Sequence, residues 1–201
     1  MSSADSYGHS GMRRLIVQEL ITVDGYVAGP DGELDFFDSV SDYSHVDRDN
    51  LQILEDVDTV LLGADTYRMF VQYWPTADEP VANTVNTMPK LVFSSTLNEA
   101  PWGTWQPAEV VKGDAAAKVA DLKRQPGKDL MLWGSLSLAR SLTRAGLLDE
   151  LQLRVVPVAI GSGEKLFPDD LGRLDLELIE GKLYPSGIIS TRYRPRRTPG
   201  A

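Results

Sequence analysis

The sequence predicts a single α/β domain, built on a mixed, mainly parallel sheet that is flanked by helices and ends in an antiparallel C-terminal hairpin. Its 201 residues are the length of one ordinary domain. A hydrophobic content of 42% with 24% charged residues is typical of a globular chain. Short apolar runs alternate with helical patterns through most of the chain, which indicates a parallel α/β body.

Four short apolar runs predict the central strands. They span residues 15–17, 59–62, 91–93 and 130–133. None shows the polar alternation of a half-exposed strand, so each fits a strand that is covered on both faces, as in a parallel sheet.

Three helices are predicted between these strands from their capping residues. Ser44 is the expected N-cap of a helix over residues 45–56, and Asp114 is the expected N-cap of the next one. Ser135 is the expected N-cap of a third helix over residues 136–145.

The pattern changes near the C-terminus. Apolar residues alternate with polar ones over 151–155 and 174–178, which predicts strands with one wetter face. A turn over 184–187 leads into a last strand over 188–193, so the chain is expected to end in an antiparallel hairpin.

Charge and composition exclude several classes of function. The chain carries 20 basic and 29 acidic residues, a net charge of -9, which repels nucleic acid and anionic lipid. The absence of cysteine excludes disulfides, thiolate zinc sites and cysteine nucleophiles, and with two histidines we predict no metal site. The chemistry is left to carboxylates, hydroxyls, backbone groups or a bound cofactor.

The ends of the chain are interpreted as segments outside the fold. Residues 1–11 are small and polar and lack the apolar stretch of a signal peptide, so we interpret them as a disordered leader. The folded domain is expected over 12–194, with a frayed tail over 195–201. No run approaches the roughly 18 apolar residues of a membrane span, and a cytoplasmic protein is expected.

Small or hydroxyl-bearing residues follow three of the predicted strands. Gly134 and Ser135 end one strand, Gly63 begins a second junction that includes Thr66, and hydroxyl residues at 94–96 end a third. In an open α/β sheet, ligands bind outside the carboxyl ends of the strands, and helix N-termini favour anions. Together the junctions suggest a phosphate-bearing ligand, whereas each one alone also fits an ordinary turn.

A glycine-rich segment, residues 22–32, follows the first strand. Such a loop can fold over a ligand as a lid, and it equally fits a long surface connection with turns at its two Asp-Gly pairs. The glycines at 161 and 163 do not complete a dinucleotide fingerprint, because Leu166 stands where the third glycine is needed.

Five segments occur in a characteristic order and spacing: TVDG at 22–25, GADTY at 63–67, KLVFSST at 90–96, GLLDEL at 146–151 and PVAIGSG at 157–163. In these segments the chain resembles the dihydrofolate reductase-like superfamily, and specifically the C-terminal reductase domain of bifunctional riboflavin-biosynthesis deaminase/reductase proteins. The zinc ligands of the accompanying deaminase domain cannot be built without cysteine. The sequence therefore reads as a stand-alone reductase domain.

The resemblance implies an eight-stranded sheet, an NADPH cleft along the strand ends, and hydride transfer to a small heteroaromatic substrate, either a pteridine or a ribosylaminopyrimidine-like ring. It also implies which residues bind the cofactor. These are Gly25, Gly63, Thr66, Ser94, Ser95, Thr96, Gly134, Ser135 and Leu136.

Candidate catalytic and substrate-side residues follow from the same resemblance. The carboxylate that holds the ring and helps to deliver a proton is sought among Asp35, Asp38 and Asp42. Asp24, in the loop that would cover the nicotinamide, is a further catalytic candidate. Aromatic residues that could line the substrate side are Phe36, Tyr67, Phe70 and Trp74, although an aromatic residue near a core helix more often packs in the core.

Two departures from the family pattern bear on the cofactor. Ala64 stands where many members carry a basic residue, so Arg68 or Lys112 would have to meet a 2′-phosphate. Ser135 replaces the second of two glycines and crowds the pyrophosphate position. NADPH is the expected cofactor, and NADH stays open.

Two rival interpretations stay open at this point. One is a non-catalytic nucleotide- or pterin-binding protein on the same fold, and the other is a chiefly structural dimer. A homodimer is expected in either case, because the predicted strand over 151–160 is long and apolar and could pair with a partner.

Overall fold

The computed structural model describes residues 12–196, so the predicted leader and the end of the tail lie outside the described residues. The strands are β1 (Leu15–Thr22), β2 (Tyr26–Ala28), β3 (Val57–Gly63), β4 (Lys90–Phe93), β5 (Ala100–Trp102), β6 (Trp105–Val111), β7 (Asp129–Trp133), β8 (Glu150–Val156), β9 (Glu164–Lys165), β10 (Leu176–Leu183) and β11 (Ile189–Pro195). The α-helices are α1 (Ser44–Leu54), α2 (Ala64–Tyr73), α3 (Ala82–Thr87), α4 (Ala115–Arg124) and α5 (Leu136–Arg144). Three short 3-10 turns are η1 (Asp35–Ser39), η2 (Trp74–Thr76) and η3 (Asp169–Leu171).

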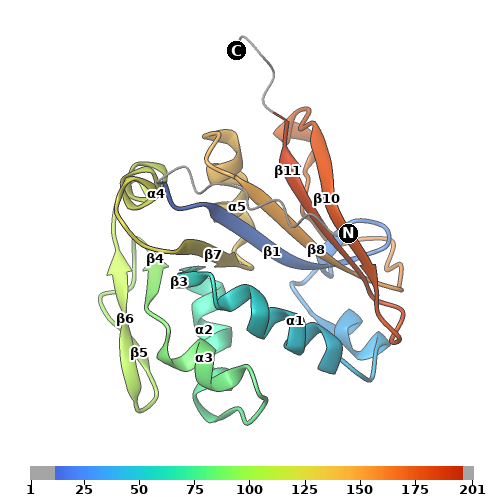
Figure 1. Ribbon diagram of the computed structural model, residues 1–201, viewed down its shortest axis with the longest axis horizontal. Helices are drawn as coiled ribbons and strands as arrows, with labels where there is room; N and C mark the ends of the chain where they lie inside the picture. The colour runs from blue at the N-terminus through green and yellow to red at the C-terminus, as the bar shows by residue number, and fades with distance from the viewer. Residues whose placement is uncertain (1–11, 197–201) are drawn as a thin grey trace, which may run out of the picture.

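The strands form one mixed sheet in the order β10-β11-β8-β1-β7-β3-β4-β6-β5, and β2 and β9 form a separate two-stranded ribbon. The six strands from β8 to β6 run parallel to one another, while β11 is antiparallel to β8 and β10 is antiparallel to β11. The predicted mainly parallel sheet with an antiparallel C-terminal hairpin is confirmed (Figure 1).

The main sheet has nine strands, and the expectation of eight is wrong. The additional strand, β5, is a three-residue edge strand that pairs antiparallel with β6. It contains Pro101, whose missing N–H is tolerated at an edge. A proline in so short a run gave no strand signal.

Helices cover both faces of the sheet, as the uninterrupted apolar runs predict. Figure 1 shows α1, α2 and α3 on one side and α4 and α5 on the other. On β1, Ile16 packs into the core on the first side, whereas Leu15 and Val17 pack into the core on the second. No helix within residues 12–196 is long and apolar enough to cross a membrane.

The predicted N-cap positions of α4 and α5 are confirmed, that of α1 is wrong, and only in α4 does the side chain form the capping hydrogen bond. The Asp114 carboxylate accepts hydrogen bonds from the amides of Ala116 and Ala117 at 2.8 and 3.1 Å, which confirms it as the N-cap of α4. Ser44 is the first residue of α1 instead of its cap. Ser135 occupies the cap position of α5 without a capping hydrogen bond, because its hydroxyl is engaged elsewhere.

Three expectations about the C-terminal strands are also wrong. The face of β8 predicted to be wetter is buried, with Gln152 0% and Arg154 1% exposed. The strand has no free edge, because β1 and β11 pair with its two sides, so it cannot pair with a second copy. The homodimer itself stays a prediction. The last strand also continues to Pro195, one residue past the expected end of the domain.

Candidate functional site

The three predicted junctions lie along one edge of the sheet. β7, β3 and β4 are adjacent and parallel, with Leu61 paired to Leu132 and Gly63 paired to Phe93. Because parallel strands end at the same edge, the segments that follow these three strands are neighbours. The structure thus brings together residues that are up to 72 positions apart in the chain.

Two of these junctions are joined by hydroxyl groups. The Gly63 amide donates to Ser135 Oγ at 2.5 Å. The Ser135 amide and hydroxyl each lie 2.9 Å from Thr66 Oγ1, to which both donate. We call Gly63, Thr66, Gly134 and Ser135 the strand-end cradle.

The cradle leaves no room for a side chain at either glycine. A Cβ on Gly63 would lie 2.9 Å from Ser135 Oγ, and one on Gly134 would lie 2.8 Å from Thr66 Oγ1. Gly134 has φ +57°, and Ser135, with φ 58°, is the one non-glycine residue of 12–196 in the left-handed region. Two successive left-handed residues turn the chain sharply from β7 into α5, which brings both backbones together.

Helices α2 and α5 both begin at the cradle, and neither has a side-chain N-cap. The cap position of α2 is Gly63, which has no side chain, and the Ser135 hydroxyl at the cap position of α5 bonds to Thr66 instead. No side chain therefore occupies the first N–H groups of either helix, and they can meet a ligand. The positive ends of the two helix dipoles also attract negative charge to this place. An arrangement of this kind favours an anion such as a pyrophosphate.

A lysine that follows β6, Lys112, contacts the third junction. Ser94 Oγ accepts hydrogen bonds from the amides of Thr96 and Leu97 at 3.2 and 3.0 Å. Lys112 Nζ donates to the Ser95 carbonyl at 3.0 Å, so its ammonium group sits beside this hydroxyl-rich turn. Arg68, the other basic candidate, is paired instead with Asp65 on α2.

Asp24 fastens the glycine-rich loop to the segment after β8. Its Oδ1 accepts from the Thr22 hydroxyl at 2.6 Å and its Oδ2 accepts from the Gly161 amide at 2.7 Å. The Thr22 hydroxyl, with help from the Gly161 amide, holds the pKa of Asp24 below its ordinary value. Further along the loop, β2 pairs with β9. The catalytic role of Asp24 stays a prediction. Its bonds to the Thr22 hydroxyl and the Gly161 amide favour a role in positioning the loop.

The other predicted carboxylates are not gathered at the cradle. Asp35 and Asp38 are exposed on η1. Asp42 accepts a hydrogen bond from the Ser44 amide at 2.9 Å, and this bond lowers its pKa. The proton donor therefore stays a prediction.

The four predicted aromatic residues divide into two pairs. Phe36 and Tyr67 are 2% and 5% exposed in separate core clusters, so the structure assigns them to packing. Phe70 and Trp74 are half-buried, with ring centroids 6.1 Å apart. Phe70 also lies 6.2 Å from Trp133, the residue directly before Gly134. The substrate-side prediction remains for Phe70 and Trp74.

The sequence analysis missed a buried polar chain on the α1 side of the sheet. Trp133 Nε1 donates to Gln18 Oε1 at 2.7 Å, and Gln18 Nε2 donates to Gln152 Oε1 at 2.8 Å. Gln152 Nε2 then donates to Glu150 Oε1 at 2.7 Å. We call this the amide chain. Its one sequence signal is the polar pair at 18–19 inside an otherwise apolar β1.

Glu19, the second residue of that pair, was also missed. It is 7% exposed, and its Oε1 has no hydrogen-bond partner among the described residues. Burial raises the pKa of Glu19 to about 8, so the carboxyl group is mostly protonated at neutral pH.

Comparison with known proteins identifies relatives over most of the chain. The family model described as RibD C-terminal domain matches residues 13–190. The uncharacterized protein YyaP of Bacillus subtilis (strain 168) is 31% identical over 186 residues, which cover 90% of this chain and 94% of that protein.

Two solved structures extend the comparison to the fold. A protein from Shewanella sp. PV-4, described as a "Putative riboflavin biosynthesis protein", is 26% identical with a TM-score of 0.76, covering 92% of this chain and 99% of that chain. Dihydrofolate reductase from Enterococcus faecalis, solved in complex with NADP(H), is 12% identical with a TM-score of 0.59, covering 92% of this chain and 97% of that chain. The fold is dihydrofolate reductase-like.

Proposed function

We propose, from the premise that this chain belongs to the RibD C-terminal domain family, that it is an NAD(P)H-dependent reductase. Its substrate would be a small heteroaromatic ring, a pteridine or a ribosylaminopyrimidine-like compound. The observation that carries the proposal is the strand-end cradle, where two uncapped helix N-termini are joined through Thr66 and Ser135. The name of the Shewanella protein supports the riboflavin-related substrate class.

The residues of the cradle fit a dinucleotide. The free amides at the starts of α2 and α5 would bind the pyrophosphate, and the missing Cβ atoms of Gly63 and Gly134 would let it approach the backbone. When bound, the nicotinamide supplies the hydride. The protein would hold cofactor and substrate in line, with Phe70 and Trp74 beside the ring.

Lys112 is proposed to distinguish NADPH from NADH. Its ammonium group lies beside the turn over residues 94–97, where the resemblance puts the adenosine ribose and its 2′-phosphate. Lys112→Gln is expected to weaken NADPH binding about tenfold, which corresponds to a loss of about 1.4 kcal/mol of binding free energy, and to leave NADH binding unchanged. Equilibrium titration of nicotinamide fluorescence measures both affinities.

A matched control is Lys118→Gln, which removes a half-exposed lysine of α4 that pairs with Glu109 at 3.5 Å. It should alter neither affinity. Equal losses of NADPH and NADH affinity in Lys112→Gln would instead mean that the lysine only supports the turn through its carbonyl contacts.

The reductase function is tested in two steps. A thermal-shift screen of NADPH against NADH should show a higher unfolding temperature with NADPH. Stopped-flow mixing of the NADPH complex with a panel of dihydropterins and ribosylaminopyrimidines should then show oxidation of the cofactor by at least one compound. Cofactor binding without turnover on the whole panel would favour the alternative, a non-catalytic nucleotide- or pterin-binding protein.

A further inference from the structure

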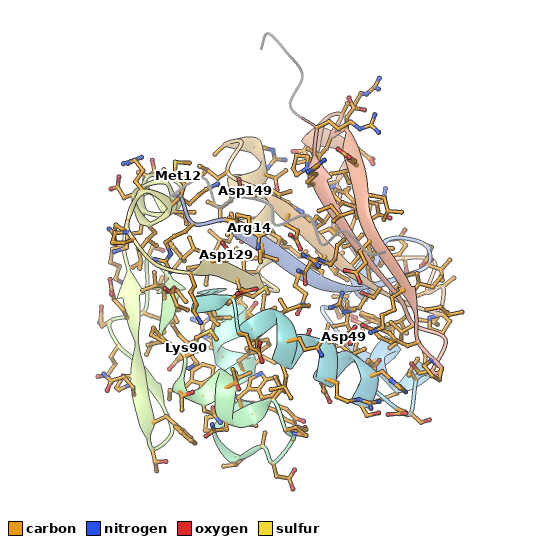
Figure 2. All side chains as sticks on the ribbon, in the orientation of Figure 1. Met12, Arg14, Asp49, Lys90, Asp129 and Asp149 are labelled. Carbon is orange, nitrogen blue, oxygen red and sulfur yellow. The ribbon has the colours of Figure 1, made fainter. Side chains whose placement is uncertain are left out.

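A cavity lies beside α1, on the side of this helix that faces away from α2. This cavity, of about 230 Å³, opens between α1 and strands β1, β8, β11 and β10. Figure 1 shows α1 between α2 and α3 on one side and the β10–β11 hairpin on the other. Figure 2 labels Asp49 on α1, and its carboxylate reaches Lys182 of β10. No residue of the strand-end cradle lines this cavity, so it is separate from the cofactor site proposed above.

Four cationic side chains line the cavity: Arg14, Arg154, Lys182 and Arg192. Three of them already have carboxylate partners. Lys182 Nζ lies 2.7 Å from Asp49 Oδ2, and two of the arginines bond to opposite oxygens of Glu150, at 3.1 and 2.7 Å. Their positive charges are therefore balanced within the protein.

Arg154 is the exception. Its side chain is 1% exposed, and its Nη1 donates to Ser190 Oγ at 2.7 Å. Its Nε has no hydrogen-bond partner, and no carboxylate among the described residues lies within ion-pair distance of it. Burial lowers the pKa of Arg154, yet a guanidinium group remains protonated in proteins. Asp49 and Glu180 attract the Arg154 charge only at longer range, without a direct ion pair. A buried guanidinium whose Nε–H has no acceptor is costly, which points to an oxygen supplied from outside.

The cavity has room for such an anion. A water molecule takes about 30 Å³ in the liquid, so the space exceeds what one ordered water would fill. The nearby carboxylate of Asp49 does not compete for Arg154, because it is occupied by Lys182 and by the Tyr184 hydroxyl at 2.5 Å. A ligand oxygen is thus the missing acceptor.

We propose that this cavity binds a small oxyanion, a carboxylate or a phosphate monoester, whose oxygens accept hydrogen bonds from the Arg154 guanidinium. Lys182 and Arg192, which are 48% and 30% exposed, also line the cavity, but each already has a carboxylate partner, so Arg154 supplies the donor that is still free. Planar arginine donors suit both oxyanions. The proposal does not depend on the reductase activity.

The test follows the Arg154 Nε–Hε resonance in a ¹⁵N-labelled sample of the full chain. Sodium acetate is titrated in one series and inorganic phosphate in another, with sodium chloride as the ionic-strength control. A saturable shift of this resonance with acetate, phosphate or both is expected, with half-saturation at about 10 mM or below. The series that saturates identifies the anion class.

Two variants keep the test decisive. Arg154→Gln should abolish the titrating resonance and the heat of anion binding in a parallel calorimetric titration, whereas Arg173→Gln, at an arginine that is 85% exposed, should change neither. If Arg154→Gln does not fold, Ser190→Ala assigns the resonance, because it removes the hydroxyl partner and keeps the guanidinium.

Three results would overturn the proposal. The first is no shift in either series, and the second is a non-saturating shift that the exposed arginines share. The third is a resonance that moves with protein concentration and ignores both anions, with a dimer in sedimentation analysis, because a second copy would then cover Arg154.

Discussion

Gly134→Val should weaken NADPH binding by about a hundredfold or more, equivalent to roughly 2.7 kcal/mol, while the protein remains folded. The new Cβ would lie 2.8 Å from Thr66 Oγ1 and 3.0 Å from Thr66 Cγ2. Thr66 would have to move, and with it the hydroxyl contacts that hold the starts of α2 and α5 together. Titration of nicotinamide fluorescence gives the change in Kd, and urea unfolding gives the change in stability.

Gly146→Val is the matched control for this experiment. Gly146 has φ +68°, close to the φ +57° of Gly134, but a Cβ there meets nothing within 4 Å. Both variants therefore carry a left-handed backbone penalty of roughly 1–2 kcal/mol, and only Gly134→Val disturbs the cradle. An unchanged NADPH affinity in Gly134→Val would remove the pyrophosphate site from these helix starts.

Glu19→Gln should make the protein more stable at alkaline pH, by on the order of 4 kcal/mol at pH 9. Burial raises the pKa of Glu19 to about 8 from its ordinary value of 4.5. Between these pH values the folded protein keeps a proton that the unfolded chain has released, so stability falls as the pH rises. Above pH 8 the full penalty persists. A glutamine has no charge to bury, so the variant escapes this loss.

The measurement is the difference in unfolding free energy between wild type and Glu19→Gln at pH 5 and pH 9, from urea titrations. The difference cancels the other titrating groups and should be small at pH 5 and large at pH 9. Glu109→Gln, at a carboxylate that is 62% exposed, serves as control and should show no such trend. Parallel stability profiles for wild type and Glu19→Gln would show that Glu19 is solvated or paired in solution.

Much of the fold could be predicted because apolar runs report burial directly. Leu61, Leu130 and Leu132 are 0% exposed, as expected for strands covered on both faces. The positions of Gly63 and Gly134 at the ends of two predicted strands also indicated that they lie close together, because adjacent parallel strands end at the same edge of a sheet. These conclusions need only the period and the topology of the chain.

The remaining features depend on contacts between distant segments, which a local pattern does not contain. A serine before a helix predicts a cap, yet Ser135 bonds to Thr66, 69 positions away. Alternation in β8 predicts a wet face, yet Gln152 and Arg154 are buried between α1 and the hairpin. Polar residues in a strand look alike in sequence whether water or another side chain satisfies them.

The amide chain has a fixed direction, because the indole of Trp133 can only donate a hydrogen bond and the ionised carboxylate of Glu150 can only accept one. The two glutamines between these ends therefore have a single orientation. Substitution of one of these four side chains leaves the next buried amide without a hydrogen-bond partner, which lowers the stability of the fold by roughly 1–3 kcal/mol. Across relatives, substitutions at these four positions should accordingly occur as coordinated sets that preserve the donor-to-acceptor order, and single exchanges should be rare.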